Sequence, residues 1–263
     1  MKPNYKNWVP KGMVVSFIGV AVVSLICLLL FGAAGIGVTG TLRTVLTVVF
    51  AVIFVASAAY AIFCVVWYQA FSYSGKRQLS KQIISGTAEH VHLPKGGKGL
   101  DVGCGSGALT IACAKRNPQG MMMGIDYWGK NYASFNKPLC ENNAAAEKVD
   151  NVSFKRGNAV KLEFEDESFD AVTSNYVYHN ITGADKQKLL LESLRVLKKG
   201  GTFTIHDIMS QSRYGDMRAF AEKLKGMGYK RVELIDTTKG LFMSPKEAKF
   251  LMLGGSTLLV GEK

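Results

Sequence analysis

The chain has 263 residues, of which 48% are hydrophobic and 20% charged, and its formal net charge is +12. A disordered chain is poorer in apolar residues and richer in charge, so this composition excludes global disorder. The charge is unevenly spread: residues 1–100 carry nine bases and one acid, whereas residues 101–263 carry 23 bases and 19 acids. The sequence therefore predicts two parts, an apolar first third with basic flanks and an ordinary globular remainder.

Two uncharged stretches, one on each side of Arg43, dominate the first third. They hold 31 and 32 residues, and a helix needs about 20 apolar residues to cross a bilayer. The glycine-rich segment 32–40 between them suits a short turn. We therefore predict a transmembrane hairpin over residues 1–75, with spans at about 13–34 and 44–68.

Basic residues flank both ends of this hairpin, whereas Arg43 is the one charged residue between the spans. By the positive-inside rule we expect a two-span protein of the cell membrane with both termini and the globular part in the cytoplasm. A cleaved signal peptide is an alternative, but the first apolar run is long for one and a second span follows it. A pair of buried core helices is another, but both segments are apolar on every face. The flanking bases are Lys2, Lys6 and Lys11 before the hairpin and Lys76, Arg77 and Lys81 after it.

After a juxtamembrane helix and linker at 76–97, strand and helix patterns alternate to the end of the chain. Such alternation predicts a parallel sheet covered by helices on both faces. The last two strands have no long helix between them, which indicates an antiparallel pair at the sheet edge. We therefore predict an α/β domain at 98–263 with a doubly wound, mostly parallel seven-stranded sheet. The expected elements are, in chain order, a strand at 99–103, a helix at 108–116, a strand at 121–125, a helix at about 132–148, strands at 152–155 and 169–174, a helix at 185–197 that ends in a basic last turn and glycines at 198–201, a strand at 202–207, a helix at 214–227, and strands at 231–236 and 257–261.

The most informative segment is a glycine loop after the first of these strands. It reads Asp-x-Gly-x-Gly-x-Gly from Asp101 to Gly107, and alternate glycines let the backbone approach a ligand closely. Asp126 ends the next strand, the position from which an acid holds ribose hydroxyls in doubly wound sheets. The loop also satisfies a dinucleotide fingerprint, so a nicotinamide-dependent oxidoreductase is an alternative. Asp101, however, would repel a pyrophosphate and accept a cationic ligand.

Beyond this loop, the sequence resembles the class I S-adenosylmethionine-dependent methyltransferases over residues 76–263. This resemblance implies a Rossmann-like fold, S-adenosyl-L-methionine as the cofactor, and methyl transfer to a small molecule as the activity. Five motifs in the family's order and at its usual spacing carry it. They are Asp101–Gly107, Gly124–Asp126, Arg156–Ala159, Phe169–Val172 and Leu194–Gly201.

The resemblance also implies cofactor roles for the matching positions. The glycine loop would wrap the methionine part of the cofactor, with Asp101 favouring its amino group, and Asp126 would hold both ribose hydroxyls. The alternatives are structural: Asp101 as a strand-end cap, the aromatic residues as core, and Asn158, where the family commonly has Asp, as a turn residue. The predicted cofactor set is Asp101, Gly103, Cys104, Gly105, Gly107, Asp126, Tyr127 and Trp128 on the adenine, Asn158 and Ala159 at its edge, and Asn175 at the methionine end.

Candidate catalytic residues follow the fourth and fifth strands. Methyl transfer mainly requires an aligned acceptor, and a base is needed only where the acceptor must lose a proton. Ligands of such sheets bind outside the carboxyl ends of the strands, where we expect His179, Tyr178 and His206. We predict His179 or His206 as the base because histidine titrates near neutral pH, although a lone histidine is often merely hydrogen-bonded in the core.

The hairpin favours a lipid-like or otherwise lipophilic acceptor, methylated at the cytoplasmic face of the bilayer. A simple tether for a soluble or protein acceptor is one alternative, and a non-catalytic membrane protein that binds the cofactor is another. The excess bases flank the spans and form no basic-aromatic groove, so we expect no nucleic-acid partner. The five cysteines show no metal-ligand spacing, so we expect neither a metal site nor a disulfide framework. The sequence makes no prediction of oligomeric state.

Overall fold

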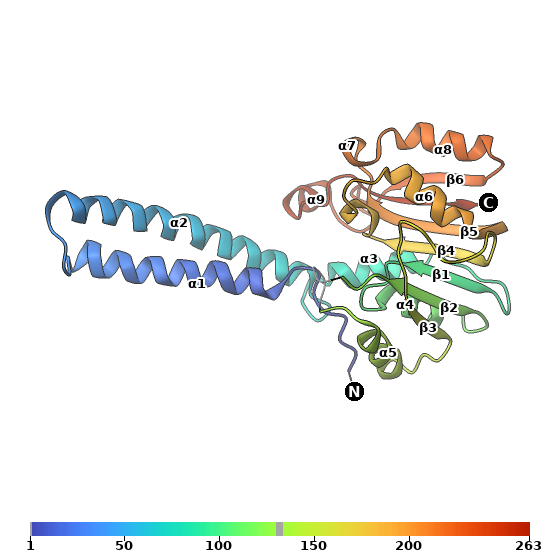
Figure 1. The fold of residues 1–263 in the computed structure, drawn as a ribbon, viewed down its shortest axis with the longest axis horizontal. Coiled ribbons are helices and arrows are strands. Elements are labelled where there is room, and N and C mark those ends of the chain that lie inside the picture. The colour runs from blue at the N-terminus through green and yellow to red at the C-terminus, as the bar shows by residue number, and fades with distance from the viewer. Residues whose placement is uncertain (1, 130–133) are drawn as a thin grey trace. The chain divides into compact units, whose positions relative to one another are not determined.

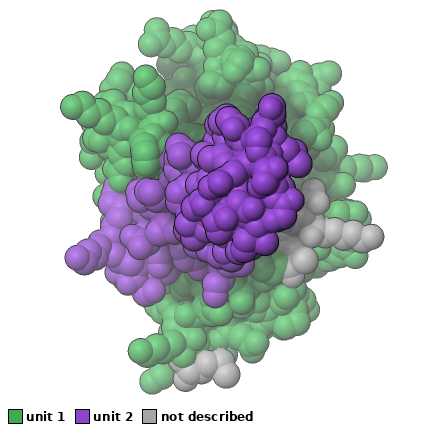
Figure 2. Space-filling model, turned by 90° about the vertical axis from the view of Figure 1, so that its left-hand side faces the viewer, with its two compact units in different colours: residues 1–6, 81–263 green, residues 7–80 purple. Residues whose placement is uncertain are grey.

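The structure, a computed structural model, describes residues 2–129 and 134–263. It divides into two compact units, which Figure 2 colours separately. One unit is the hairpin, Asn7–Ser80, and the other is Lys81–Lys263 together with the described residues up to Lys6. The first residues of the chain therefore group with the α/β unit, whereas the sequence analysis placed them with the hairpin.

The hairpin unit contains two long helices joined by a short loop (Figure 1). Helix α1, Lys11–Cys27, continues into a π-helical segment, Leu28–Ala33, and α2 spans Gly40–Phe71. Both helices are long and apolar enough to cross a membrane, and only 11% and 17% of their apolar windows are buried inside the protein. A core helix of a globular protein would be mostly buried, so this exposure argues against the buried-pair alternative.

Arg43 lies near the start of α2 and contacts the end of the preceding helix. Its guanidinium donates to the carbonyls of Gly32, at 2.9 Å, and Ala33, at 2.8 Å. These carbonyls belong to the last turn, where no intrahelical donor is available, so the arginine caps that helix end. Between the two helices, the rings of Phe17 and Tyr60 stack with centroids 5.1 Å apart.

The α/β unit is built on one seven-stranded sheet in the order β3-β2-β1-β4-β5-β7-β6 (Figure 1). Strand β7 runs antiparallel to both neighbours, and the other pairings are parallel. This arrangement confirms the predicted doubly wound, mostly parallel sheet with an antiparallel pair at its edge. The strands are β1 Lys98–Val102, β2 Met121–Asp126, β3 Val152–Arg156, β4 Phe169–Asn175, β5 Leu197–Ile208, β6 Lys230–Asp236 and β7 Ser256–Glu262.

The helices of this unit begin at polar capping residues. Asn136, Asp185 and Asp216 each accept a backbone N–H of the first turn with a side-chain oxygen, which satisfies donors that the helix itself cannot. The helix expected at 132–148 begins at Lys137 in the structure, and positions 132 and 133 of that prediction lie outside the described residues. The helices are α3 Leu79–Ala88, α4 Ala108–Arg116, α5 Lys137–Ala146, α6 Lys186–Arg195, α7 Gln211–Tyr214, α8 Met217–Gly226 and α9 Pro245–Phe250, with a 3-10 turn at Tyr178–Asn180.

Two local predictions differ from the structure. Residues 198–201, expected as the last turn of a helix and its glycine stop, lie in β5, because buried Leu197 pairs with Phe169 at the start of β4. The two short helices α7 and α9 occupy segments where the sequence indicated either a longer helix or irregular chain. Helices of four and six residues leave too little periodicity to recognise.

The core lies around the central strands and the helices α6 and α8. Burial of one such large apolar side chain contributes about 1.5–3 kcal/mol, so the core holds the middle of the sheet rigid. The carboxyl ends of β1, β2, β4 and β5 consequently form a fixed edge on which polar side chains can be positioned. Core residues with at most 1% exposure include Leu100, Val172, Phe203, Leu224 and Leu259.

Candidate active site

The glycine loop after β1 places three glycines in the left-handed region. Gly103, Gly105 and Gly107 have φ values of +77°, +56° and +80°. A Cβ at Gly103 would lie 2.3 Å from Val177, so packing requires glycine there. At Gly105 the nearest atom among the described residues would be 3.9 Å away, on Phe135. Gly105 therefore presents a backbone surface that another molecule can approach, the kind of cradle that a cofactor in van der Waals contact needs.

Asp126, at the end of β2, is hydrogen-bonded to this loop. Its carboxylate accepts the backbone N–H of Gly105 at 2.9 Å and that of Trp128 at 2.7 Å. The Trp128 indole N–H donates back to the carbonyl of Gly105 at 2.9 Å. Each carboxylate oxygen keeps a second lone pair, so Asp126 can accept ribose hydroxyls while it fixes the loop.

The two predicted adenine-packing aromatics have different surroundings. Trp128 is held across the loop by its bond to Gly105, whereas Tyr127 is 58% exposed. The guanidinium carbon of Arg156 lies 5.0 Å from the centroid of the Tyr127 ring. Tyr127 is thus the more exposed of the two aromatics beside Asp126, and it fits a stacking role better than Trp128, which is partly buried.

Asp101, the first residue of the loop motif, is 1% exposed. The hydroxyl of Thr110 on α4 donates to its carboxylate at 2.6 Å. Burial is the main cause that raises the pKa of Asp101 to about 7, and the negative charge of Asp126 acts in the same direction while the hydrogen bond from Thr110 opposes it. A cation placed beside such a carboxyl group stabilises its ionised form. Asp101 is therefore suited to pair with the amino group of the cofactor.

Two cysteines accompany the loop. Cys104 is buried, and burial raises the pKa of its thiol well above the usual value. The thiol of Cys140 on α5 donates to the carbonyl of Gly105 at 3.3 Å. The Cys104 thiol is therefore a neutral, space-filling group beside the glycine loop, and Cys140 contacts the loop from α5.

At the end of β3, Asn158 forms a local turn. Its side-chain oxygen accepts the N–H of Val160 at 2.9 Å, and its backbone carbonyl accepts that of Lys161 at 3.2 Å. The residue is exposed, and neighbouring Ala159 packs partly against the core. This geometry supports the alternative of a turn residue. Because the turn uses the side-chain oxygen of Asn158, a contact with adenine would have to use its side-chain NH2 group.

His179, just after β4, is paired with Asp207 on β5. Its Nδ1 lies 2.5 Å from the Asp207 carboxylate, and its backbone N–H also donates to that group at 3.2 Å. Burial alone would raise the pKa of Asp207, but the hydrogen bond and charge of His179 hold it below the usual value. Because an ionised carboxylate only accepts, Nδ1 carries the proton and Nε2 is left as the acceptor. The His179 side chain is 15% exposed, so this nitrogen belongs to a partly accessible group.

The other two catalytic candidates are buried and hydrogen-bonded. His206 is 0% exposed, with Nδ1 2.9 Å from Oδ1 of Asn175 and Nε2 3.0 Å from the hydroxyl of Thr237. Burial lowers the pKa of His206 to about 3, so it is neutral at physiological pH. The Tyr178 hydroxyl is likewise buried, 2.6 Å from that of Ser193. Both nitrogens of His206 are occupied, and so the surroundings favour His179 as the base.

Sequence reasoning missed the partner of His179. His206 and Asp207 are adjacent on β5, so alternation along a strand points their side chains to opposite faces. Asn175 of β4 lies opposite His206 in the register, which leaves Asp207 on the other face. The signal that could have revealed it is an acid directly after a buried histidine, at the end of a central strand.

A second missed residue, Asn143 on α5, joins the glycine loop to the start of the chain. Its side chain accepts the N–H of Asn4 at 2.7 Å, donates to the carbonyl of Asn4 at 3.2 Å and donates to that of Ser106 at 3.0 Å. The hydroxyl of Tyr5 donates to Glu147 at 3.2 Å. Asn143 is 2% exposed, so this buried amide depends on both backbone segments for its partners.

With this geometry in view, comparison with known proteins identifies the family. A family model described as a methyltransferase domain matches residues 93–233, more than half of the chain. The chain belongs to this methyltransferase family. The resemblance inferred from the five motifs is therefore confirmed at the level of the family.

Curated relatives match a shorter region. A demethylmenaquinone methyltransferase of Staphylococcus aureus strain JH9 is 43% identical over 108 residues, 41% of each chain. A protein of the same name from Lactobacillus johnsonii is 38% identical over 103 residues, 39% of this chain and 40% of its own. The matched region thus spans about two-fifths of the length of these relatives.

Solved structures agree on the fold. A geranyl diphosphate methyltransferase in complex with GPP and sinefungin has a TM-score of 0.55 at 15% identity, over 74% of this chain and 81% of its own. The [4+2]-cyclase SpnF has a TM-score of 0.54 at 19% identity, over 71% and 82%. A methyltransferase and a cyclase share the fold, so the reaction has to be argued from the site.

Proposed function

We propose that the protein is a membrane-anchored S-adenosylmethionine-dependent methyltransferase that transfers a methyl group to a small lipophilic acceptor. The observation that carries the proposal is the joined arrangement of Asp101, the open backbone at Gly105 and Asp126. It offers a carboxyl group for an ammonium, a surface for close backbone approach, and a carboxylate for a diol. These are the groups that a sulfonium amino acid nucleoside presents.

When bound, the cofactor supplies an electrophilic methyl group, and the chain's residues supply orientation. The hydrogen bonds of Asp126 to Gly105 and Trp128 fix the loop before the cofactor arrives. Alignment of two reactants by a rigid site lowers a barrier by on the order of 7–11 kcal/mol at best. The rigid loop, rather than acid or base chemistry alone, is therefore the main catalytic device.

His179 acts as the general base that removes the proton from a hydroxyl or carbon-acid acceptor. Its Nε2 accepts that proton, while the Nδ1–H bond to Asp207 keeps the ring oriented and stabilises the resulting imidazolium. Asp207 is a positioning residue, because its side chain is fully buried and acts through His179. General base assistance of this kind contributes typically about 10²–10⁴-fold in rate.

The acceptor is proposed to be a quinone-type lipid. The curated relatives are demethylmenaquinone methyltransferases, and the two apolar helices of this chain suit an acceptor that partitions into a bilayer. We further propose that the hairpin spans the membrane with both termini and the catalytic unit in the cytoplasm, as the basic flanks favour. Arg43, the charged residue between the two spans, caps the end of the preceding helix.

Calorimetry with the full chain in detergent micelles tests the cofactor assignment. We expect S-adenosylhomocysteine to bind and NAD not to bind, and Asp126→Ala to weaken S-adenosylhomocysteine binding at least tenfold. Binding of NAD alone would instead support the oxidoreductase alternative. Incubation with methyl-labelled cofactor and a reduced demethylated quinone should then yield a labelled lipid. Cofactor binding without any labelled product from a membrane lipid extract would support the non-catalytic alternative.

A further inference from the structure

The connection between β6 and β7 carries an unusual exposed surface. It contains α9 and the turns on either side of it. Leu241, Phe250 and Met252 are exposed by 46%, 49% and 67%, respectively. Three exposed lysines accompany these apolar side chains. We call this surface the α9 patch: Lys239, Leu241, Lys246, Lys249, Phe250 and Met252.

Met252 is exposed at a position where the backbone favours glycine. Its φ is +60°, and the N–H groups of Met252 and Leu253 bond to the carbonyls of Lys249 and Ala248 at 3.3 and 2.8 Å. This is the paired hydrogen-bond pattern that ends helices with a left-handed residue, usually glycine. A methionine here strains the backbone and exposes apolar surface to water. Met252 therefore adds a large exposed apolar side chain at a position that glycine would fill with less strain.

The charges of the α9 patch have one sign. Lys246, Lys249 and Phe250 lie three and four residues apart, which places them on one side of α9. Glu247 is the one acid between residues 237 and 253, against three lysines. Lys239 is 76% exposed and pairs with Asp236 at 3.4 Å. Exposed apolar side chains and exposed lysines in one short segment match the surface of an anionic bilayer, where the apolar groups enter the interface and the lysines meet the headgroups.

The α9 patch is also connected to the helix that follows the second apolar span. Phe242 packs so closely on α3 that a Cβ at Gly86 would lie 2.2 Å from its ring. Seven residues separate the end of α2 at Phe71 from the start of α3 at Leu79. An extended segment of that length reaches roughly 25 Å at most. Once the hairpin is inserted, the chain itself therefore keeps α3 close to the bilayer surface.

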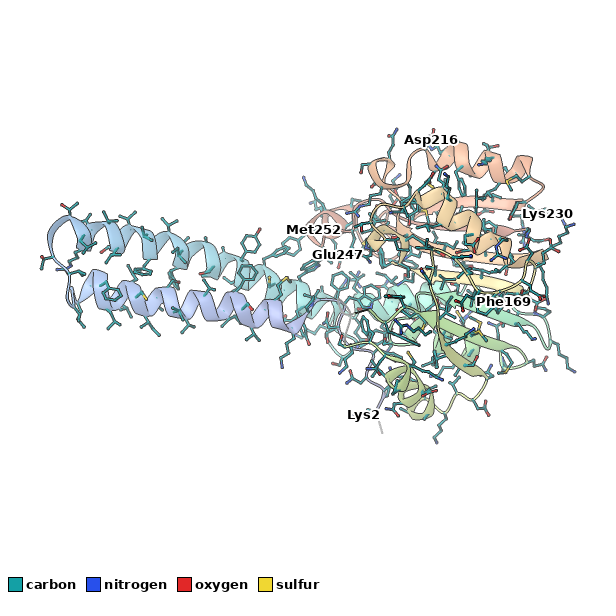
Figure 3. The ribbon with its side chains drawn as sticks, in the orientation of Figure 1. Lys2, Phe169, Asp216, Lys230, Glu247 and Met252 are labelled. Carbon is teal, nitrogen blue, oxygen red and sulfur yellow. The ribbon has the colours of Figure 1, made fainter. Side chains whose placement is uncertain are left out.

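The same connection borders the acceptor end of the candidate active site. Thr237, directly after β6, bonds to His206, and Ser256, the first residue of β7, bonds to the hydroxyl of Tyr176 at 2.7 Å. In Figure 3, Met252 and Glu247 lie at the opposite end of the unit from Phe169, the first residue of β4. The α9 patch is thus at the edge where the parallel strands end and ligands of such sheets bind.

We propose that the α9 patch docks the α/β unit onto the anionic cytoplasmic leaflet, so that a lipophilic acceptor enters the site from the bilayer. This inference rests on the proposed membrane insertion of the hairpin, and it adds a second, peripheral lipid contact. Three lysines near such a surface each change the docked population by roughly fivefold. Docking would therefore respond steeply to the anionic lipid content.

The test uses a photo-crosslinking amino acid at Leu241 in the full chain, reconstituted into phosphatidylcholine nanodiscs with and without phosphatidylglycerol. The matched control carries the same amino acid at Met227, which is 55% exposed after α8. We expect phospholipid adducts at position 241, several-fold more with phosphatidylglycerol, and few at 227. Lys246→Glu with Lys249→Glu should reduce the adducts at 241 by on the order of tenfold or more.

Met252→Gly separates docking from folding, because glycine relieves the left-handed strain. We expect this variant to melt no lower than the wild type and to give several-fold fewer lipid adducts at position 241. Three results would overturn the proposal. They are equal yields of lipid adducts at positions 241 and 227, adducts of position 241 to protein alone, and a yield at 241 that neither the lysine substitutions nor Met252→Gly changes. Calorimetry with S-adenosylhomocysteine on the same samples reports the proposed function separately. Lipid adducts without cofactor binding would sustain the docking surface and reject the enzyme.

Discussion

We predict that Asp101 lowers the free energy of unfolding of the cofactor-free protein at alkaline pH. Burial raises the pKa of Asp101 from 3.8 to about 7. Between these two values the folded chain binds a proton that the unfolded chain has released, so stability falls as the pH rises from about 4 to about 7. At about pH 8 the full penalty is roughly three pKa units, or about 4 kcal/mol at most.

Asp101→Asn removes this penalty and keeps an oxygen for the Thr110 hydroxyl. The buried amide brings its own cost, about 1–3 kcal/mol if its N–H groups lack acceptors, but that cost does not vary with pH. The measurable quantity is therefore a difference: the stability of the variant relative to wild type should be about 2 kcal/mol higher at about pH 8 than at about pH 5.5, because Asp101 titrates in that interval.

The assay is urea unfolding of the full chain in detergent micelles at both pH values, followed by tryptophan emission. Asp170→Asn is the control. Burial would raise the pKa of Asp170, but bonds from Lys198 and the backbone of Lys98 hold it below its usual value, so its removal should destabilise the protein at both pH values. Calorimetry should show that Asp101→Asn binds S-adenosylhomocysteine more weakly. A relative stability that is the same at both pH values would refute the account of Asp101.

Three further predictions follow from the site and the hairpin. His179→Gln should lower the rate of methyl transfer by about 10²–10⁴-fold and leave the affinity for S-adenosylhomocysteine unchanged. His206→Gln should instead lower the melting temperature and keep the activity of the folded fraction. Equal losses of activity in the labelled-cofactor assay would contradict the assignment of His179 as the base. Gly105→Ala should cost about 1 kcal/mol of stability, because alanine is strained in the left-handed region, and it should abolish cofactor binding measured by calorimetry. Gly103→Ala should fail to fold, because its Cβ would lie 2.3 Å from Val177. A Gly105→Ala protein with wild-type affinity would place the cofactor elsewhere. A reporter fused after Lys263 should register in the cytoplasm, and an external signal would reverse the proposed topology.

The sheet was predictable because its strands are short apolar runs bounded by glycine and polar residues. The loop from Asp101 to Gly107 could also be placed, since a glycine-rich turn directly after a buried strand has few other uses. Residues 198–201 could not, because two lysines and two glycines suit the end of a helix as well as the exposed start of a strand. Only the pairing of Leu197 with Phe169 in space decides between them.

The choice among the histidines was beyond the sequence for a different reason. His179 and His206 both follow or end central strands, and each has a titratable ring. What distinguishes them is the set of neighbours on adjacent strands: Asp207 for one, Asn175 and Thr237 for the other. Those contacts depend on strand order and register, which a single sequence does not specify.

The link from Asn4 through Asn143 to Ser106 bears on how a soluble form of this protein could be made. Simple removal of everything before Lys81 would discard the hairpin and also strip Asn143 of two of its three hydrogen bonds. A buried amide left in that state costs about 1–3 kcal/mol, next to the loop on which cofactor binding depends. The better design keeps the first six residues and rejoins them to Lys81 through a flexible linker, so that only the apolar helices are lost.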